Sequence, residues 1–132
     1  MQLSSLQEQN AIALLNELLE ILQNSSYDEG TLTIVKIIHK SLIRDGVLDR
    51  NIYLYSYKKA HQNALRYRYP VEITRIAKKS LKHIGVFESY EEGSEYQFWI
   101  AKKDQADGLA APVSVFFKEN LNVGKISYMG SL

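Results

Sequence analysis

The sequence predicts an α+β fold in which N-terminal helices and a basic central helix pack on a C-terminal antiparallel sheet. Leucines at helical spacing fill the first helix, and apolar residues return to that period over residues 71–84. The last third of the chain alternates strand-like runs with turns. A length of 132 residues with 45% apolar side chains suits a single domain, residues 1–132.

The N-terminal third is expected to hold two helices. Residues 5–23 form the first, because Ser5 and Glu8 fit a capping box and apolar side chains follow three and four positions apart. A second helix is expected over residues 31–45, with Gly46 as its stop. Its β-branched residues leave a strand at its start as an alternative.

The middle of the chain predicts a strand, a short helix and the basic helix. Residues 51–57 are aromatic and branched, which favours a strand, and residues 59–66 suit a short helix. Pro70 moves the preceding residue out of the helical region, after which residues 71–84 return to the helical period. The apolar face of this helix would hold Ile73, Ile76, Ala77, Leu81 and Ile84, and its basic face Arg75, Lys78, Lys79 and Lys82.

The C-terminal region predicts two strand pairs. Residues 86–90 and 95–102 read as a hairpin joined by residues 91–94, and residues 113–118 and 125–129 read as a further pair. Both faces of such a sheet would carry aromatic rings, because Trp99 and Phe116 fall opposite Phe98 and Phe117.

Charge is distributed unevenly along the chain, although the net charge is only +1. Residues 53–83 carry eight Lys or Arg and one acidic side chain, whereas residues 1–50 and 84–132 each carry four basic and seven acidic ones. A polarised chain of this kind predicts an anionic partner, with nucleic acid as the first candidate. The candidate nucleic-acid-binding residues are Lys58, Lys59, Arg66, Arg68, Arg75, Lys78, Lys79 and Lys82.

The order of a basic helix, Gly85 and a hairpin is similar to that of winged-helix DNA-binding domains, and residues 70–81 loosely resemble their supporting and recognition segments. The resemblance implies that the basic face meets phosphates or base edges in the major groove. Two observations leave other interpretations open. The predicted wing tip is acidic, and a basic stripe can be the solvated face of an amphipathic helix. The acidic residues are Glu88, Glu91, Glu92 and Glu95.

Residues 65–70 alternate cations with aromatic rings. On an extended segment Arg66 and Arg68 would point to one side and Tyr67 and Tyr69 to the other. Tyrosines so placed could stack on bases or belong to the core, and a core role is expected for at least one of them.

No enzymatic activity, metal or cofactor is expected. Cysteine is absent, His39, His61 and His83 lack ligand spacing, and no phosphate-binding glycine loop occurs. The leading hypothesis is a small, regulatory, dimeric nucleic-acid-binding protein. The alternatives are a non-catalytic protein-interaction module, such as an adaptor or inhibitor, and a small-ligand sensor domain. A cytoplasmic location without membrane contact is expected, since neither a signal peptide nor a bilayer-spanning run is present.

Overall fold

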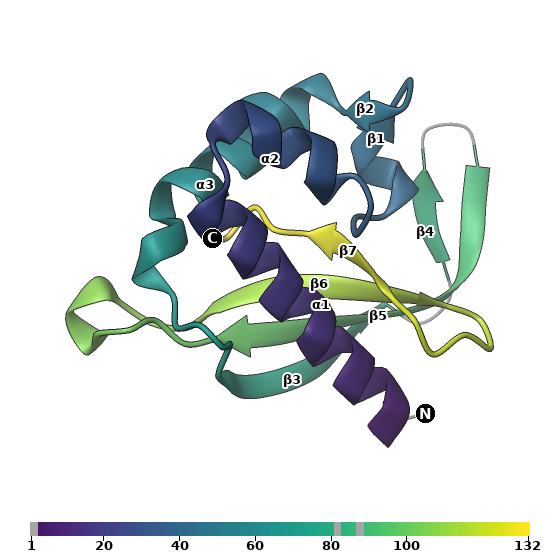
Figure 1. Ribbon diagram of the computed structural model, residues 1–132. Helices are drawn as coiled ribbons and strands as arrows, with labels where there is room; N and C mark the ends of the chain where they lie inside the picture. The colour runs from purple at the N-terminus through teal and green to yellow at the C-terminus, as the bar shows by residue number, and fades with distance from the viewer. Residues whose placement is uncertain (1–2, 81–82, 87–88) are drawn as a thin grey trace.

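The structure is a computed structural model that describes residues 3–80, 83–86 and 89–132. Within these residues, three α-helices pack against an antiparallel sheet, and a small hairpin forms a second sheet (Figure 1). The α+β class predicted from the sequence is confirmed. The elements in chain order are α1 (Ser5–Asn24), α2 (Tyr27–Ile34), a 3-10 turn (Lys40–Leu42), β1 (Ile43–Arg44), β2 (Val47–Leu48), a π-helical turn (Ile52–Tyr57), α3 (Lys58–Asn63), a 3-10 turn (Ala64–Arg66), β3 (Ile73–Ser80), β4 (His83–Val86), β5 (Ser89–Ile100), a 3-10 turn (Gln105–Asp107), β6 (Ala111–Lys118) and β7 (Lys125–Tyr128).

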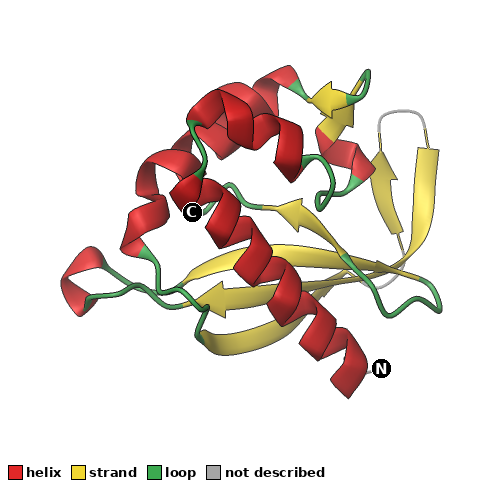
Figure 2. Cartoon of the chain, viewed as in Figure 1, coloured by secondary structure: helices red, strands yellow, loops and turns green. Residues whose placement is uncertain are grey.

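The main sheet has the strand order β3-β5-β6-β7, and β4 pairs with the far end of β5. Side chains alternate between two faces of this sheet. The face that we call inner packs on α1, which crosses it in front, while α2 and α3 lie above (Figures 1 and 2). The inner face supplies much of the hydrophobic core, with Tyr96, Phe98, Ile100, Ala111, Val113, Val115, Phe117 and Ile126.

The first helix agrees with its prediction, and its cap lies one residue earlier than expected. Ser4 Oγ accepts a hydrogen bond from the Gln7 amide at 3.1 Å, and Gln7 Oε1 accepts one from the Ser4 amide at 3.1 Å. The helix buries one stripe of side chains against the sheet, namely Ala11, Leu15, Leu18, Leu19, Ile21 and Leu22.

The predicted basic helix over residues 71–84 is wrong, because this segment forms the strands β3 and β4. Both strands pair antiparallel with the long strand β5. The register shifts between Ile73 and Arg75, so that Ile73 pairs with Ile100 and Ile76 with Phe98. A β-bulge therefore brings two apolar residues three positions apart to the same face, a spacing that imitates a helix. The winged-helix arrangement is not confirmed.

The predicted turn at residues 91–94 is also wrong, because these residues lie within β5. Instead, β4 and β5 pair antiparallel from His83 and Glu92 to Val86 and Ser89. Residues 87–88, and with them Glu88 of the predicted wing tip, lie outside the described residues. Gly93 has a packing role in β5. A Cβ at Gly93 would lie 2.1 Å from the Phe117 carbonyl oxygen and 2.6 Å from Phe116 Cζ.

Residues 51–57 are helical, not a strand. The π-helical turn places Tyr57 in the core, where its hydroxyl donates to the Tyr27 carbonyl at 2.6 Å. Asp49 caps the segment, because its Oδ2 accepts from the Asn51 amide at 3.1 Å. Tertiary packing and a cap thus override the strand propensity of the tyrosines.

The second predicted helix is displaced toward the N-terminus. It runs from Tyr27 to Ile34, and Ser26 caps it by accepting from the Glu29 amide. Beyond it, Ile38 forms a parallel bridge to Ile126 of β7, so residues 31–45 are neither one helix nor a helix preceded by a strand. The short helix predicted at residues 59–66 and the strand pair at residues 113–118 and 125–129 are confirmed as α3 with its 3-10 turn and as β6 with β7.

We predict that Gly93→Ala destabilises the fold by about 2–3 kcal/mol, because the new methyl group would overlap the backbone of β6. Urea unfolding measures the change. Ser94→Ala is the matched control on the same strand, and we expect it to change the free energy of unfolding by less than about 1 kcal/mol. Equal effects of the two substitutions would contradict this account.

Candidate functional site on the outer face of the sheet

Cationic side chains lie over aromatic rings on the outer face, which faces away from α1. Arg75 Cζ of β3 lies 4.5 Å from the ring centroid of Trp99 on β5. Lys79 Nζ lies 4.9 Å from the ring centroid of Tyr128 on β7. Arg75 and Lys79 are exposed and Tyr128 is 38% exposed, so these groups are accessible to a partner.

Two polar side chains lie between these pairs. Gln97 of β5 is in register with Ser114 of β6, and Ser114 is in register with Tyr128. Ser114 is fully buried, and its Oγ has no hydrogen-bond partner among the described residues. We call the following six residues the outer-face cluster: Arg75, Lys79, Gln97, Trp99, Ser114 and Tyr128.

A buried carboxylate bounds the outer-face cluster on one side. Glu95 is 8% exposed, and its Oε2 accepts a hydrogen bond from Ser127 Oγ at 2.6 Å. Because Glu95 would repel an anion, the attractive part of the face lies toward Arg75 and Trp99.

The structure distributes the sequence-predicted cations over several regions. Of the seven that lie within the described residues, Arg75 and Lys79 enter the outer-face cluster. Lys78 lies 5.9 Å from the ring centroid of Tyr96, a core residue of the inner face. Lys82 lies outside the described residues.

The remaining four cations lie on α3 and just after it. Lys58 and Lys59 are exposed on α3, and Lys59 Nζ donates to the Gly130 carbonyl at 3.3 Å. Arg66 ends the following 3-10 turn, and Arg68 forms an ion pair with Glu72 at 3.3 Å.

The two tyrosines of residues 65–70 have different environments. Tyr67 is 1% exposed and its hydroxyl donates to the Leu132 carbonyl at 3.2 Å, so the expected core role is confirmed for this residue. Tyr69 is 48% exposed, and its hydroxyl donates to Glu20 at 3.3 Å.

The sequence analysis found no partner for His39 and treated Glu91 as a turn residue, so it missed the contact between these two side chains at the end of the sheet. His39 is 2% exposed, and its Nε2 lies 2.6 Å from Glu91 Oε1. The Ser41 amide donates to His39 Nδ1 at 3.0 Å, which makes Nε2 the nitrogen that donates to Glu91. Lys40 and Lys118 lie 3.8 and 3.7 Å from the other carboxylate oxygen of Glu91.

This hydrogen-bonded chain links segments that are distant in the sequence. Ser41 Oγ lies 2.9 Å from Nδ1, so hydroxyl, imidazole and carboxylate follow in an order that hydrolases use. However, Nδ1 already accepts the Ser41 amide, and the imidazole is closed off from solvent. Burial lowers the pKa of His39, and the hydrogen bond from its ring to Glu91 opposes that shift.

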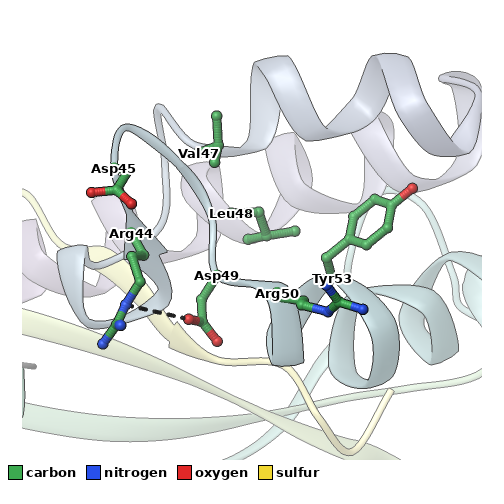
Figure 3. Close-up of a pocket in the computed structure, with 7 residues that line it drawn as sticks. All are labelled: Arg44, Asp45, Val47, Leu48, Asp49, Arg50 and Tyr53. Atoms are coloured by element: carbon green, nitrogen blue, oxygen red, sulfur yellow. Dashed lines mark ion pairs between the residues drawn. The ribbon is translucent and has the colours of Figure 1, made fainter.

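An open pocket with a volume of about 340 Å³ lies beside the β1–β2 hairpin (Figure 3). Arg44 Nε lies 3.9 Å from Asp49 Oδ1, and the Tyr53 hydroxyl donates to Asp28 at 2.8 Å. That hydrogen bond raises the pKa of Tyr53 to about 12. Two arginines and two aspartates balance one another in the lining, so the pocket has less attraction for an anion than the outer-face cluster. The lining residues are Arg44, Asp45, Val47, Leu48, Asp49, Arg50 and Tyr53.

The described part of the chain offers neither a metal-binding cluster nor a membrane-spanning helix. No group of three or more His, Asp or Glu side chains there could hold a metal ion. No helix there has both the length and the apolar character needed to cross a bilayer.

Comparison of the chain with protein-family models, with curated proteins and with solved structures gives no match. The proposals below therefore depend on the residues and geometry of this chain alone.

We predict that His39→Gln reduces the pH dependence of stability. Because the pKa of His39 is lowered in the fold, the unfolded chain binds the proton more readily, and stability decreases as pH falls below about 6.5. The contribution is at most about 1.4 kcal/mol per pH unit. Urea unfolding near pH 7.5 and 5.5 measures it.

His61→Gln is the control. We expect this variant to lose as much unfolding free energy between pH 7.5 and 5.5 as the wild type does. An equal loss in His39→Gln and the wild type would show that His39 does not cause the dependence.

Proposed function

We propose that this chain is a small protein that binds single-stranded nucleic acid on the outer face of its sheet, in a cytoplasmic setting. The observation that carries the proposal is the pairing of Arg75 with Trp99 and of Lys79 with Tyr128 on one exposed surface. Aromatic rings on a sheet stack on unpaired bases, and neighbouring cations contact the phosphates.

The shape of this surface favours a single strand over a duplex. Reading the major groove requires a helix or a two-stranded ribbon that projects from the body. The basic segment that was expected to supply such a helix forms the strands β3 and β4, and its basic residues Arg75, Lys78 and Lys79 belong to β3 at the edge of the main sheet. Trp99 and Tyr128 lie on β5 and β7 with β6 between them, so their backbones are roughly 10–12 Å apart. Separate bases of an extended strand can occupy two rings at that distance.

The exposed apolar side chains in the loops next to β6 do not support the alternative of a protein-interaction module. The most exposed apolar side chains of the loops next to β6 are Leu109 before the strand and Val123 after it. These loops leave opposite ends of an eight-residue strand, which are roughly 25 Å apart, so the two side chains do not form one apolar patch.

We predict that a fluorescently labelled oligonucleotide of about ten nucleotides binds the chain with an affinity that falls steeply with salt. The double variant Arg75→Glu/Lys79→Glu should bind at least tenfold more weakly. Each lost phosphate contact should reduce the slope of log K against log salt by about 0.7. Fluorescence anisotropy over a series of salt concentrations measures both quantities.

Lys58→Glu is the control for this experiment, because it reverses an exposed charge on α3 without touching the outer-face cluster. It should change affinity less than twofold. Equal weakening by both variants would show that general charge, and not this face, attracts the strand. No binding at low salt would contradict the proposal and favour the protein-interaction module.

We further predict that binding quenches the intrinsic fluorescence of Trp99, which is the only tryptophan of the chain. A stacked base would replace the Arg75 guanidinium over the indole ring. Titration with unlabelled oligonucleotide measures the quenching, and Tyr128→Leu should weaken binding about tenfold while keeping the quenching at saturation. Tight binding without a change in Trp99 emission would place the strand elsewhere.

A further inference from the structure

A buried polar group without a partner lies at the centre of the outer face. Ser114 Oγ is inaccessible to solvent and makes no hydrogen bond within the described residues. Buried hydroxyls are ordinarily satisfied, so a serine at this position, where alanine would suffice for packing, requires an explanation. The side-chain amide of half-buried Gln97, the neighbour of Ser114 in register on β5, likewise has no hydrogen bond in that part of the chain.

Lys79 closes over this part of the face. Its side chain starts on β3, while the Tyr128 ring that it contacts belongs to β7. Because β5 and β6 lie between these strands, the lysine passes above the strands that carry Gln97 and Ser114. The attraction between the Lys79 ammonium and the Tyr128 ring is weak, as in other exposed cation–π pairs, so a ligand can displace the lysine from the ring.

We propose that Gln97 and Ser114 read the base of a nucleotide that stacks on Tyr128, that this base is adenine, and that Lys79 moves from the ring to the phosphate when the nucleotide binds. This inference rests on the proposed function, which supplies the strand. In the free protein, Lys79 covers the side chains of Gln97 and Ser114. In the complex, the base forms hydrogen bonds with both.

Adenine matches these side chains on more edges than the pyrimidines do, because cytosine and thymine offer a glutamine amide an adjacent donor and acceptor only on their Watson–Crick edge. A glutamine amide presents a donor and an acceptor side by side, which match the N6 amino group and N7 of adenine. Adenine offers the same combination on its Watson–Crick edge through N6 and N1, so it can pair with Gln97 on either edge. The Ser114 hydroxyl donates or accepts as required and adds a third contact.

The test uses thymine oligonucleotides of about ten nucleotides that differ in one central base, which keeps the phosphate charge constant. The full chain should bind the strand with central adenine about tenfold more tightly than the strand with central cytosine. Gln97→Leu should abolish this preference and leave the salt dependence unchanged. Ser114→Ala should reduce the preference, and it should not lower the thermal midpoint, because it removes an unsatisfied hydroxyl.

The outcomes separate the two proposals. If no oligonucleotide binds, the proposed function fails, and this inference fails with it. If all four strands bind equally, or if Gln97→Leu keeps the adenine preference, the strand-binding function stands and the base-reading role is overturned. Lys79→Met gives a second measurement. This exposed substitution should leave the protein folded and weaken binding by removing the phosphate contact, but it should keep the adenine preference.

Discussion

The contrast between a largely buried inner face and a partly exposed outer face of the sheet determines both the stability and the surface of this molecule. Along β5 and β6, alternate side chains enter the core, and Phe98, Val113 and Val115 have no exposed surface at all. Full burial of such a side chain contributes about 1.5–3 kcal/mol each. The intervening positions face away from α1, and they hold the Trp99 ring, the Gln97 amide and the Ser114 hydroxyl.

The two ends of the outer face differ in chemistry. Toward the C-terminal end of β5, the exposed Arg75 guanidinium lies over the half-buried Trp99 ring. Toward the other end, Phe116 is 3% exposed and its ring meets the His39 ring at 5.0 Å. The hydrogen bond between His39 and Glu91 closes that end of the face, so its contacts contribute to stability.

The sequence was informative where one period or one propensity dominated. Leucine spacing predicts α1 well, and the branched and aromatic residues around Phe116 predict β6. Prediction from the sequence failed where the local patterns of residues were ambiguous. The β-bulge after Ile73 gives β3 a helical apolar spacing, and the Tyr-rich segment before Tyr57 becomes helical through tertiary contacts.

The candidate site could be predicted only in part for the same reason. Placing Trp99 opposite Phe98 requires only alternation, and this prediction is confirmed by the register with β6. The contact of Arg75 with Trp99 depends on β3 being a strand in a shifted register. Such long-range pairing has no local signal in a single sequence, and neither has the burial of Ser114.

The position of β3 at the edge of the sheet affects self-association. Edge strands present backbone groups to which another chain can add, and inward or flanking charges discourage this. Arg75, Lys78 and Lys79 occupy one such strand of eight residues. Two copies that approached edge to edge would bring six cations together, so growth of a continuous sheet from this edge is electrostatically disfavoured at low ionic strength.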